Sequence, residues 1–218
     1  PPLFDMDGTL LRSTATIELA RQLGQLEAGN RIETMWLEGR ITDDDFWLSL
    51  LDICKDATEA DLEDAFRSSP WMDGVPETFA DIRSRGEHII VISQSPTFFV
   101  RGLEAWGANE TYGSAVALGS PLENSATLMP EMKVAIAKKA LADRNLDELH
   151  CVVYGDSTSD VELFTTFPHS VAVNPTATLA PLAAQCYVGT DIREAYAMGR
   201  ELLALSTTKQ AAQGSTHK

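Results

Sequence analysis

The sequence predicts an α/β protein with a parallel sheet covered by helices on both faces, and a small all-helical segment inserted after the first strand. Three observations support this. Short, nearly all-apolar segments alternate with helical ones over residues 75–173, which is typical of parallel sheets buried on both faces. Residues 14–69 show only the helical spacing of apolar residues. The length, 218 residues of which 44% are hydrophobic, suits one domain with a sizeable insertion.

The beginning of the chain predicts one strand and then a run of helices. The strand is Leu3–Asp5, which is followed by Gly8, a residue that lets the chain turn. Periodic apolar residues and polar N-caps then predict four helices that form an inserted helical unit, residues 13–74, which the family resemblance given below implies is a cap domain. The first helix passes through Ile17, Leu19, Leu23 and Leu26, with Ser13 or Thr14 as its N-cap. The second covers Arg31–Glu38, the third begins at Thr42, and the fourth is capped at Thr58.

The remainder of the chain predicts alternating helices and strands after a linker at Pro70–Pro76. The predicted helices are Val75–Arg85, Phe98–Trp106, Glu131–Asn145 and Asp160–Phe167, and the predicted strands are His88–Ile92, Thr111–Leu118, Cys151–Tyr154 and Val171–Val173. Gly119–Met129 is predicted as a loop or hairpin, and the polar segment Ser206–Lys218 is expected to fray. Residues 1–12 and 75–218 together predict a Rossmann-like core.

The charge of the chain argues against some classes of partner. The net charge is −15 and no basic residues cluster, so nucleic acid and anionic membranes are not expected as partners. No apolar run reaches membrane-spanning length, and no signal peptide is visible. Cys54, Cys151 and Cys186 are widely spaced beside apolar residues, which predicts reduced packing residues. These features favour a cytoplasmic location and leave the oligomeric state, monomer or homodimer, open.

Two acidic residues two positions apart follow the first predicted strand. Residues at i and i+2 of an extended segment point to the same side, so Asp5 and Asp7 can face one reaction centre. Two neighbouring carboxylates repel each other and are costly to bury. They suit a site that holds a divalent cation and a phosphate, one carboxylate as nucleophile and metal ligand and the other as proton donor. An Asp-rich turn after an edge strand is the alternative.

Polar residues suited to chemistry also come after the later predicted strands. In parallel α/β sheets, ligand sites collect outside the carboxyl ends of the strands, so these residues are expected near Asp5 and Asp7. Each alone has an ordinary explanation as a helix cap, a solvated lysine or an acid in a turn. They are Ser93, Gln94, Lys133, Asp156 and Asp160.

The order of these motifs resembles the haloacid dehalogenase superfamily. The set consists of Asp5-x-Asp7, then Ser93, then Lys133, then Gly155-Asp156-x-x-x-Asp160. The resemblance covers most of the chain, and the combination is more specific than any one motif. It implies a phosphatase that works through an aspartyl phosphate and uses Mg²⁺.

The resemblance also implies roles for the four acids. Asp5 would be the nucleophile, and Asp7 the acid that protonates the leaving oxygen and then activates water. A carboxylate at Asp7 favours hydrolysis, because related ion pumps have threonine there and keep their phosphoenzyme longer. Asp5 and Asp156 would be the side-chain ligands of Mg²⁺, joined by the backbone carbonyl of Asp7, with Asp160 at or behind these ligands.

Three further residues match the phosphate-binding part of the family pattern. Ser93 would donate a hydrogen bond to a phosphoryl oxygen, and the backbone N–H at Gln94 would supply another donor. Lys133 would neutralise phosphate charge and hold Asp5 in place, which makes it both a binding and a catalytic residue.

The inserted helices and the sequence after His88–Ile92 are similar to the phosphoserine phosphatase-like branch, whose helical C1 cap follows the first motif. That branch implies a cap acid for the ammonium of the substrate and a cap arginine for its carboxylate. The matching positions here are about Thr14 and Leu50, with Glu18 one helical turn after Thr14. Trp47 is a further candidate to line the substrate pocket.

The cap positions bear on the substrate. An amino-acid zwitterion would meet a hydroxyl at Thr14 and an apolar side chain at Leu50, without the bidentate arginine contact. The sequence therefore predicts a different small-molecule phosphomonoester: a sugar, cyclitol or biosynthetic-intermediate phosphate. A phosphoserine phosphatase with an atypical cap and a phosphotransferase or mutase on the same site remain alternatives. A non-catalytic phosphate-binding protein is least favoured, because the acids and the lysine are all present.

Overall fold

A six-stranded sheet runs through the structure, a computed structural model that describes residues 1–124 and 126–214. Every neighbouring pair of strands is parallel, in the order β3-β2-β1-β4-β5-β6. The α/β fold predicted from the sequence is confirmed. The strands are β1 Pro2–Phe4, β2 Ile90–Pro96, β3 Glu110–Ser114, β4 Val152–Gly155, β5 Ser170–Val173 and β6 Gln185–Tyr187.

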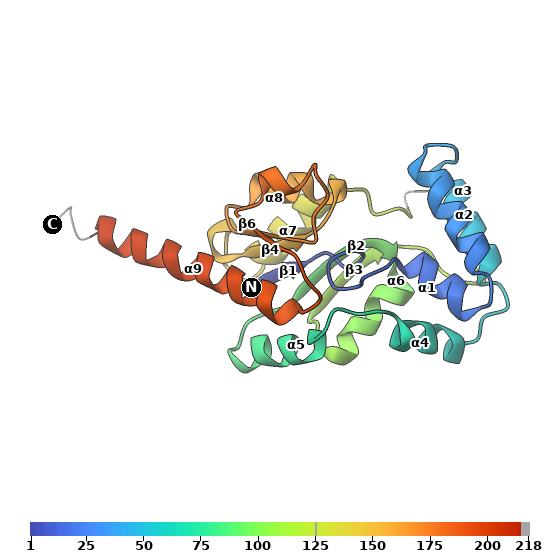
Figure 1. Cartoon of the computed structure of the whole chain (residues 1–218), viewed down its shortest axis with the longest axis horizontal. Coiled ribbons are helices and arrows are strands. Elements are labelled where there is room, and N and C mark those ends of the chain that lie inside the picture. The colour runs from blue at the N-terminus through green and yellow to red at the C-terminus, as the bar shows by residue number, and fades with distance from the viewer. Residues whose placement is uncertain (125, 215–218) are drawn as a thin grey trace.

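Helices cover both faces of this sheet and stand beyond one end of it (Figure 1). In Figure 1, α7 and α8 lie on one side of the strands and α5 on the other, while α1, α2 and α3 stand at the far end from α9. The bounds are α1 Ala15–Gln22, α2 Leu26–Leu37, α3 Asp43–Ile53, α4 Glu59–Ser68, α5 Val75–Ser84, α6 Thr97–Val100, α7 Met132–Ala142, α8 Val161–Thr166 and α9 Ile192–Gly214.

The strands alternate strictly between two apolar cores. Leu3 of β1 packs with Ile90 and Ile92 of β2 on the face that α7 and α8 cover. Phe4 and Val91 point to the opposite face, where the core continues into α5. Because successive residues of a strand face opposite ways, a strand buried on both sides must be apolar at every position. This explains why the strands could be recognised as continuous apolar runs.

The inserted helices α1–α4 share a core with the second of these faces. Leu19 of α1 and Leu50 of α3 are completely buried in the same apolar cluster as Phe4. Polar caps define where two of these helices begin: Thr42 and Thr58 each form a capping box with the aspartate three residues later. The division into a core (1–12 and 75–218) and a cap (13–74) stays a prediction, since one apolar cluster joins the two.

Some elements differ from the sequence prediction. The strand predicted over Thr111–Leu118 ends at Ser114, and the helix predicted at Arg31–Glu38 begins earlier, at Leu26. The chain expected to fray from Ser206 continues as helix α9 to Gly214, and residues 215–218 lie outside the described residues. Hydrogen bonds between successive turns propagate a helix through polar residues, so loss of apolar periodicity alone did not mark its end.

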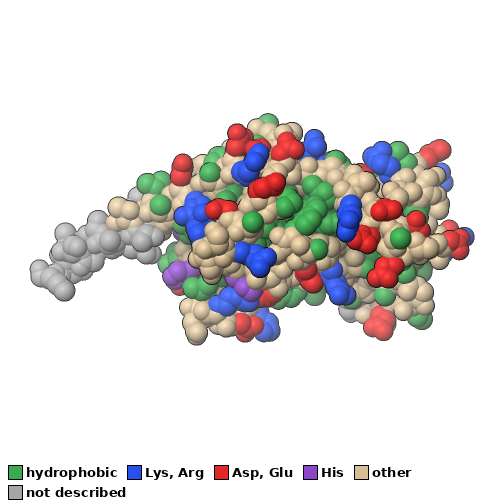
Figure 2. All heavy atoms as spheres, turned by 90° about the horizontal axis from the view of Figure 1, so that it is seen from below, with side chains coloured by type: hydrophobic (Ala, Val, Ile, Leu, Met, Phe, Trp, Pro, Cys, Tyr) green, Lys and Arg blue, Asp and Glu red, His purple; other side chains and the backbone are tan. Residues whose placement is uncertain are grey.

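The visible surface carries charged side chains of both signs (Figure 2). On the face shown in Figure 2, Lys and Arg side chains are interspersed with Asp and Glu, with apolar side chains between them. Cys54 and Cys151 are buried as predicted, but Cys186 is exposed because it lies on the edge strand β6. None of the helices within residues 1–124 and 126–214 has the length and apolar character needed to cross a membrane.

Candidate active site

The register of three central strands brings the predicted site residues from different regions of the chain to one edge of the sheet. Phe4 of β1 pairs with Val91 of β2 on one side and with Tyr154 of β4 on the other. The backbone N–H of Asp5 donates to the carbonyl of Tyr154 (2.9 Å), which continues this register by one residue. Asp156 therefore emerges from the sheet beside Asp5, at the carboxyl ends where ligand sites form in such folds.

A completely buried lysine holds two of the acids. Lys133, at the start of α7, donates from Nζ to Asp5 Oδ1 (2.9 Å) and to Asp160 Oδ1 (2.7 Å). It also reaches Ser159 Oγ at 3.3 Å. Burial by itself disfavours the ammonium, but the two carboxylates outweigh it and raise the pKa of Lys133 above its usual value. Lys133 is therefore a fixed positive charge that sets the position of Asp5.

Asp156 reaches Asp5 only because a glycine faces it. A Cβ at Gly8 would lie 2.3 Å from Asp156 Oδ2, and Gly8 has a φ of +82°, which other residues rarely adopt. Thr9 Oγ1 donates to Asp156 Oδ1 at 3.2 Å. The other acid of the motif, Asp160, binds the backbone of its own loop, because its Oδ2 accepts from the backbone N–H of Asp156 (3.0 Å). Asp160 thus ties the loop after β4 to Lys133.

Asp7 sits in a different environment from Asp5. Its Oδ1 accepts from the backbone N–H of Ala15 (3.2 Å), and its Oδ2 accepts a short hydrogen bond from Ser95 Oγ. Burial raises the pKa of Asp7 to about 7; the Ser95 hydrogen bond opposes that rise, and the charges of Asp5 and Glu33 add to it. Asp7 can therefore hold a proton near neutral pH, while burial raises the pKa of Asp5 only to about 6 because the ammonium of Lys133 opposes the rise.

The acid cluster has the composition of a site for a hard divalent cation. Asp5, Asp156 and Asp160 each offer one carboxylate oxygen, and these three oxygens all lie within 4.8 Å of one another. Burial raises the pKa of both Asp5 and Asp156, and their mutual repulsion raises that of Asp156 further. Lys133 alone cannot offset this many carboxylates, so a cation bound by oxygen ligands fits the donor set. Mg²⁺ satisfies this requirement.

Ser93 and Gln94 lie within β2, which continues past Ser93 to Pro96 with a shift in its register to β3. Ser93 is buried, and its Oγ accepts from the backbone N–H of Ser95 (3.1 Å). The side chain of Gln94 donates to the carbonyl of Leu128 (3.2 Å), which anchors the loop that leads to α7. The predicted phosphate-binding roles of Ser93 and Gln94 stay predictions.

The four cap candidates are placed differently with respect to the acids. Thr14 is nearest, because it precedes Ala15, the residue whose N–H binds Asp7. Glu18 is buried and accepts from Ser13 Oγ (2.6 Å) and from Arg21 Nε (3.2 Å). Their roles in specificity are untested, and the structure gives Glu18 partners of its own.

The other two candidates are on α3. Leu50 is completely buried in the apolar core. Trp47 is also buried, and its Nε1 donates to Thr127 Oγ1 (2.7 Å) on the segment between β3 and α7. Trp47 thus links the inserted helices to a loop from the sheet.

Sequence reasoning missed three side chains of this site. Ser95 could have been found from strand alternation, because it lies two residues after Ser93 and so faces the same way. Thr9 belongs to the first motif but was assigned no role. Glu33, on α2, accepts from Thr14 Oγ1 at 2.7 Å. No local pattern places Glu33 here, because its position depends on how α2 packs against α1.

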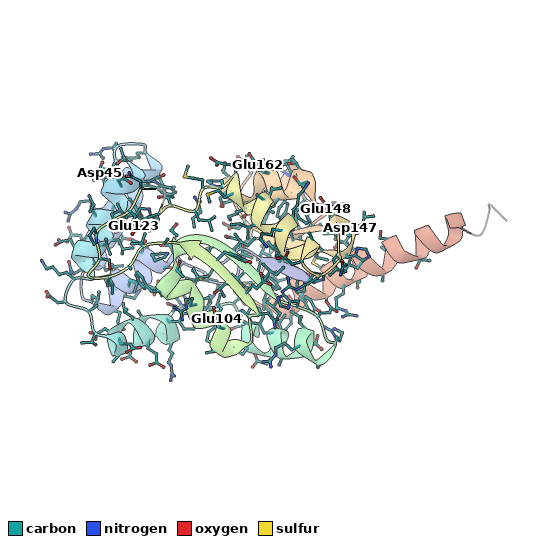
Figure 3. The ribbon with its side chains drawn as sticks, turned by 180° about the vertical axis from the view of Figure 1, so that it is seen from behind. Asp45, Glu104, Glu123, Asp147, Glu148 and Glu162 are labelled. Carbon is teal, nitrogen blue, oxygen red and sulfur yellow. The ribbon has the colours of Figure 1, made fainter. Side chains whose placement is uncertain are left out.

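Many other acids are not part of this cluster. Figure 3 labels six of them, and they lie spread over the surface of the molecule rather than gathered at one place. Asp45 and Glu123 are at the end of the molecule with the inserted helices, whereas Asp147 and Glu148 are toward the end with α9. The buried acids around Lys133 are therefore a separate feature from the acidic surface.

Comparisons with known proteins agree with this geometry. A phosphoserine phosphatase of Methanocaldococcus jannaschii is 24% identical over 198 residues, which cover 88% of this chain and 93% of that protein. A solved phosphoserine phosphatase with a phospho-aspartyl intermediate analogue has a TM-score of 0.71 at 23% identity, covering 88% of this chain and 95% of its own. A probable phosphoserine phosphatase from Vibrio cholerae has a TM-score of 0.74 at 17% identity, covering 96% and 67%.

These structural likenesses establish the fold. The family follows from a sequence model described as haloacid dehalogenase-like hydrolase, which matches residues 3–165 and includes the acid pair, the lysine and the loop after β4. The chain belongs to the haloacid dehalogenase-like hydrolase family.

Proposed function

We propose that this hydrolase is a Mg²⁺-dependent phosphatase that cleaves small-molecule phosphomonoesters through an aspartyl phosphate, an acyl phosphate formed on Asp5. The observation that carries the proposal is the contrast between two neighbouring acids. Asp5 is ion-paired with Lys133 at 2.9 Å and burial raises its pKa to about 6, whereas Asp7 has only neutral hydrogen-bond donors and its pKa is raised to about 7. One nucleophilic carboxylate beside one proton donor is what stepwise phosphate transfer to and from a protein requires.

In the first step, a carboxylate oxygen of Asp5 attacks phosphorus and the bond from phosphorus to the leaving oxygen breaks. The proton of Asp7 passes to that oxygen, so the alcohol leaves neutral. Ser95 and the N–H of Ala15 fix both oxygens of Asp7, which orients its proton toward the substrate. Lys133 remains a cation throughout and offsets part of the phosphate charge.

In the second step, Asp7 is a carboxylate and accepts a proton from water as the water oxygen attacks phosphorus. The bond between phosphorus and Asp5 breaks, which releases inorganic phosphate and regenerates both acids. Asp5, Asp156 and the backbone carbonyl of Asp7 would hold Mg²⁺, with Asp160 positioned behind them by Lys133. When bound there, Mg²⁺ would neutralise negative charge on the phosphoryl oxygens, so that the carboxylate of Asp5 could approach phosphorus.

We further propose that the substrate is a small phosphomonoester other than phosphoserine, such as a sugar, cyclitol or biosynthetic-intermediate phosphate. Leu50 occupies the position predicted to match the carboxylate-binding arginine. Its side chain is apolar and completely buried, so it offers a carboxylate no hydrogen-bond donor. The likeness to phosphoserine phosphatases favours the alternative that phosphoserine itself is turned over by an atypical cap.

The experiment that tests the reaction is phosphate release from 4-nitrophenyl phosphate with Mg²⁺, for the wild type, Asp5→Asn and Asp44→Asn. Asp5→Asn removes the nucleophile, so we expect turnover to fall by about 10³-fold or more. Asp44→Asn changes an exposed acid of α3 and should retain wild-type turnover. Undiminished activity in Asp5→Asn would contradict the mechanism.

Hydrolysis and transfer are separated in the same assay. Adding a polyol acceptor and comparing free phosphate with phosphorylated acceptor distinguishes a phosphatase from a phosphotransferase or mutase. We expect free phosphate to account for nearly all of the substrate consumed, because Asp7 can activate water.

A further inference from the structure

One carboxylate of the inserted helices stands next to the reaction centre without belonging to the acid cluster. Glu33 of α2 is half-buried and accepts a hydrogen bond from Thr14 Oγ1 at 2.7 Å. Thr14 is directly followed by Ala15, whose N–H binds Asp7 Oδ1 at 3.2 Å. Glu33 is therefore connected to the proton donor through two residues, Thr14 and Ala15, on the side of the inserted helices.

The hydroxyl of Thr14 is fully used by these contacts. Its oxygen accepts from the backbone N–H of Ile17 at 3.2 Å as the N-cap of α1, and its proton goes to Glu33. Thr14 consequently has no proton left to donate to a substrate. A carboxylate can accept about four hydrogen bonds, and Thr14 occupies one of them, so Glu33 retains acceptor capacity.

A negative charge in this place is unfavourable for a phosphatase unless the substrate compensates for it. The substrate brings a phosphate dianion, and Glu33 is connected to Asp7 through Thr14 and the N–H of Ala15. Like charges close together in a partly buried site repel each other. The part of the substrate that can make this arrangement favourable is the leaving alcohol, since Asp7 must reach the oxygen of that alcohol to protonate it.

We propose that Glu33 is a specificity residue that binds an amine on the leaving alcohol, so that the preferred substrates are amine-bearing phosphomonoesters without a carboxylate. The inference rests on the proposed phosphatase function and names its substrate class. An ammonium group supplies hydrogen-bond donors and a positive charge, and both complement the carboxylate of Glu33. Leu50, apolar and completely buried, provides nothing for a carboxylate. Amino-alcohol and amino-sugar phosphates have this chemistry.

The experiment compares three probes that differ in one group at a time. They are 2-aminoethyl phosphate, 2-hydroxyethyl phosphate and O-phosphoserine, each measured as a substrate and as a competitor of 4-nitrophenyl phosphate. The variants are Glu33→Gln, which keeps an oxygen for Thr14 but removes the charge, and Glu27→Gln, an exposed position on the same helix. A structural role of Glu33 would affect all three probes alike, so the ratio between probes is the decisive quantity.

We expect the wild type to prefer 2-aminoethyl over 2-hydroxyethyl phosphate by about 10- to 100-fold, the range of a charge-assisted hydrogen bond. Glu33→Gln should abolish this preference with little change for 2-hydroxyethyl phosphate, and Glu27→Gln should retain it. O-phosphoserine should rank below 2-aminoethyl phosphate. Equal use of the first two probes by the wild type, an equal loss for both in Glu33→Gln, or a clear preference for O-phosphoserine would each overturn the proposal.

Failure of the proposed function can be told apart from failure of this inference. Titration calorimetry with Asp5→Asn in the presence of Mg²⁺ measures the affinities for the amine probe and the hydroxyl probe without any turnover. If Asp5→Asn binds the amine probe more tightly and Glu33→Gln removes this difference, the inference is supported even if the reaction is not phosphate hydrolysis. If Asp5→Asn shows no such difference in affinity, the inference is contradicted.

Discussion

Asp5 and Asp7 show how two identical side chains acquire different chemistry from their neighbours. The nearest partner of Asp5 is an ammonium, whereas the partners of Asp7 are a hydroxyl and a backbone amide. An ammonium stabilises the charged form strongly, so it offsets part of the cost of burying Asp5. Neutral donors do so less, so burial raises the pKa of Asp7 to about 7 but that of Asp5 only to about 6. The environment, rather than the residue type, separates nucleophile from proton donor.

The close approach of Gly8 and Asp156 gives a prediction at this scale. In Gly8→Ala, the added Cβ would lie 2.3 Å from Asp156 Oδ2, so the carboxylate must move out of the acid cluster. We expect at least about 100-fold lower kcat, and a higher Mg²⁺ concentration for half-maximal activity, measured by phosphate release. Gly39→Ala is the control, because Gly39 also has a positive φ but a Cβ there meets no atom within 4 Å.

The control separates backbone strain from displacement of the acid. Gly39→Ala should lower the free energy of unfolding by about 1 kcal/mol while it leaves kcat unchanged. If Gly8→Ala likewise lost only stability and kept its response to Mg²⁺, Asp156 would not be the ligand proposed here.

Individual residues differ in how far the sequence could place them. Asp5, Lys133 and Asp156 could be predicted to meet because each follows or neighbours the carboxyl end of a strand in a parallel sheet. Ser95 was within reach of strand alternation but was overlooked. Glu33 could not be predicted, because its place depends on the packing of α2 against α1, which leaves no local pattern in the sequence.

At the scale of elements, α3 is connected to the segment between β3 and α7. Trp47 Nε1 donates to Thr127 Oγ1 at 2.7 Å, and Gln94 holds the same segment through the carbonyl of Leu128. The segment thus contacts both an inserted helix and a strand that ends at the site. Movement of α3 away from the acids would require this hydrogen bond to break.

A double-mutant cycle tests this connection. Trp47→Phe keeps an aromatic ring but removes the donor, and Thr127→Val removes the acceptor while keeping the shape. We expect each to raise KM by about 3- to 10-fold, and the double variant to resemble either single one, with a coupling of about 1 kcal/mol. Strictly additive effects on KM would show that the hydrogen bond does not hold α3 near the site.

Whole elements were predictable where burial dictated their pattern. Strands β1, β2 and β4 are apolar at successive positions because both faces are covered, and α3 and α4 begin at threonine caps that the sequence displays. The short edge strand β6 and the helix α9 were not predicted. Edge strands and exposed helical turns bury little, so their sequences carry a weak periodic signal.

For the molecule as a whole, the buried acids link stability to pH. Burial raises the pKa values of Asp5, Asp7 and Asp156, so the folded protein holds protons that the unfolded chain has already released. Where the folded state binds more protons, the free energy of unfolding falls as pH rises. For Asp7 this window extends from its ordinary pKa of 3.8 to about 7, and the loss is on the order of a few kcal/mol.

We therefore expect the metal-free protein to melt at a lower temperature near pH 8 than near pH 5, measured by calorimetry with a chelator. Mg²⁺ should raise the melting temperature, and more so at the higher pH, because only ionised carboxylates bind it well. Asp7→Asn should flatten part of the metal-free pH dependence, whereas Asp44→Asn should leave it unchanged. A melting temperature that rises with pH in the chelator would contradict the assigned sign.

The central position of β1 also has a consequence for how the molecule is made. Its two neighbours in the sheet, β2 and β4, begin 88 and 150 residues later than Pro2. Asp5 is synthesised before Lys133 and meets it only after a further 128 residues have followed. Closing such long loops costs entropy before any contact repays it, which makes folding slow relative to local helix formation. The inserted helices α1–α4 are contiguous in sequence and can form before Asp5 contacts Lys133. A nascent chain therefore has no complete active site until β4 has been translated.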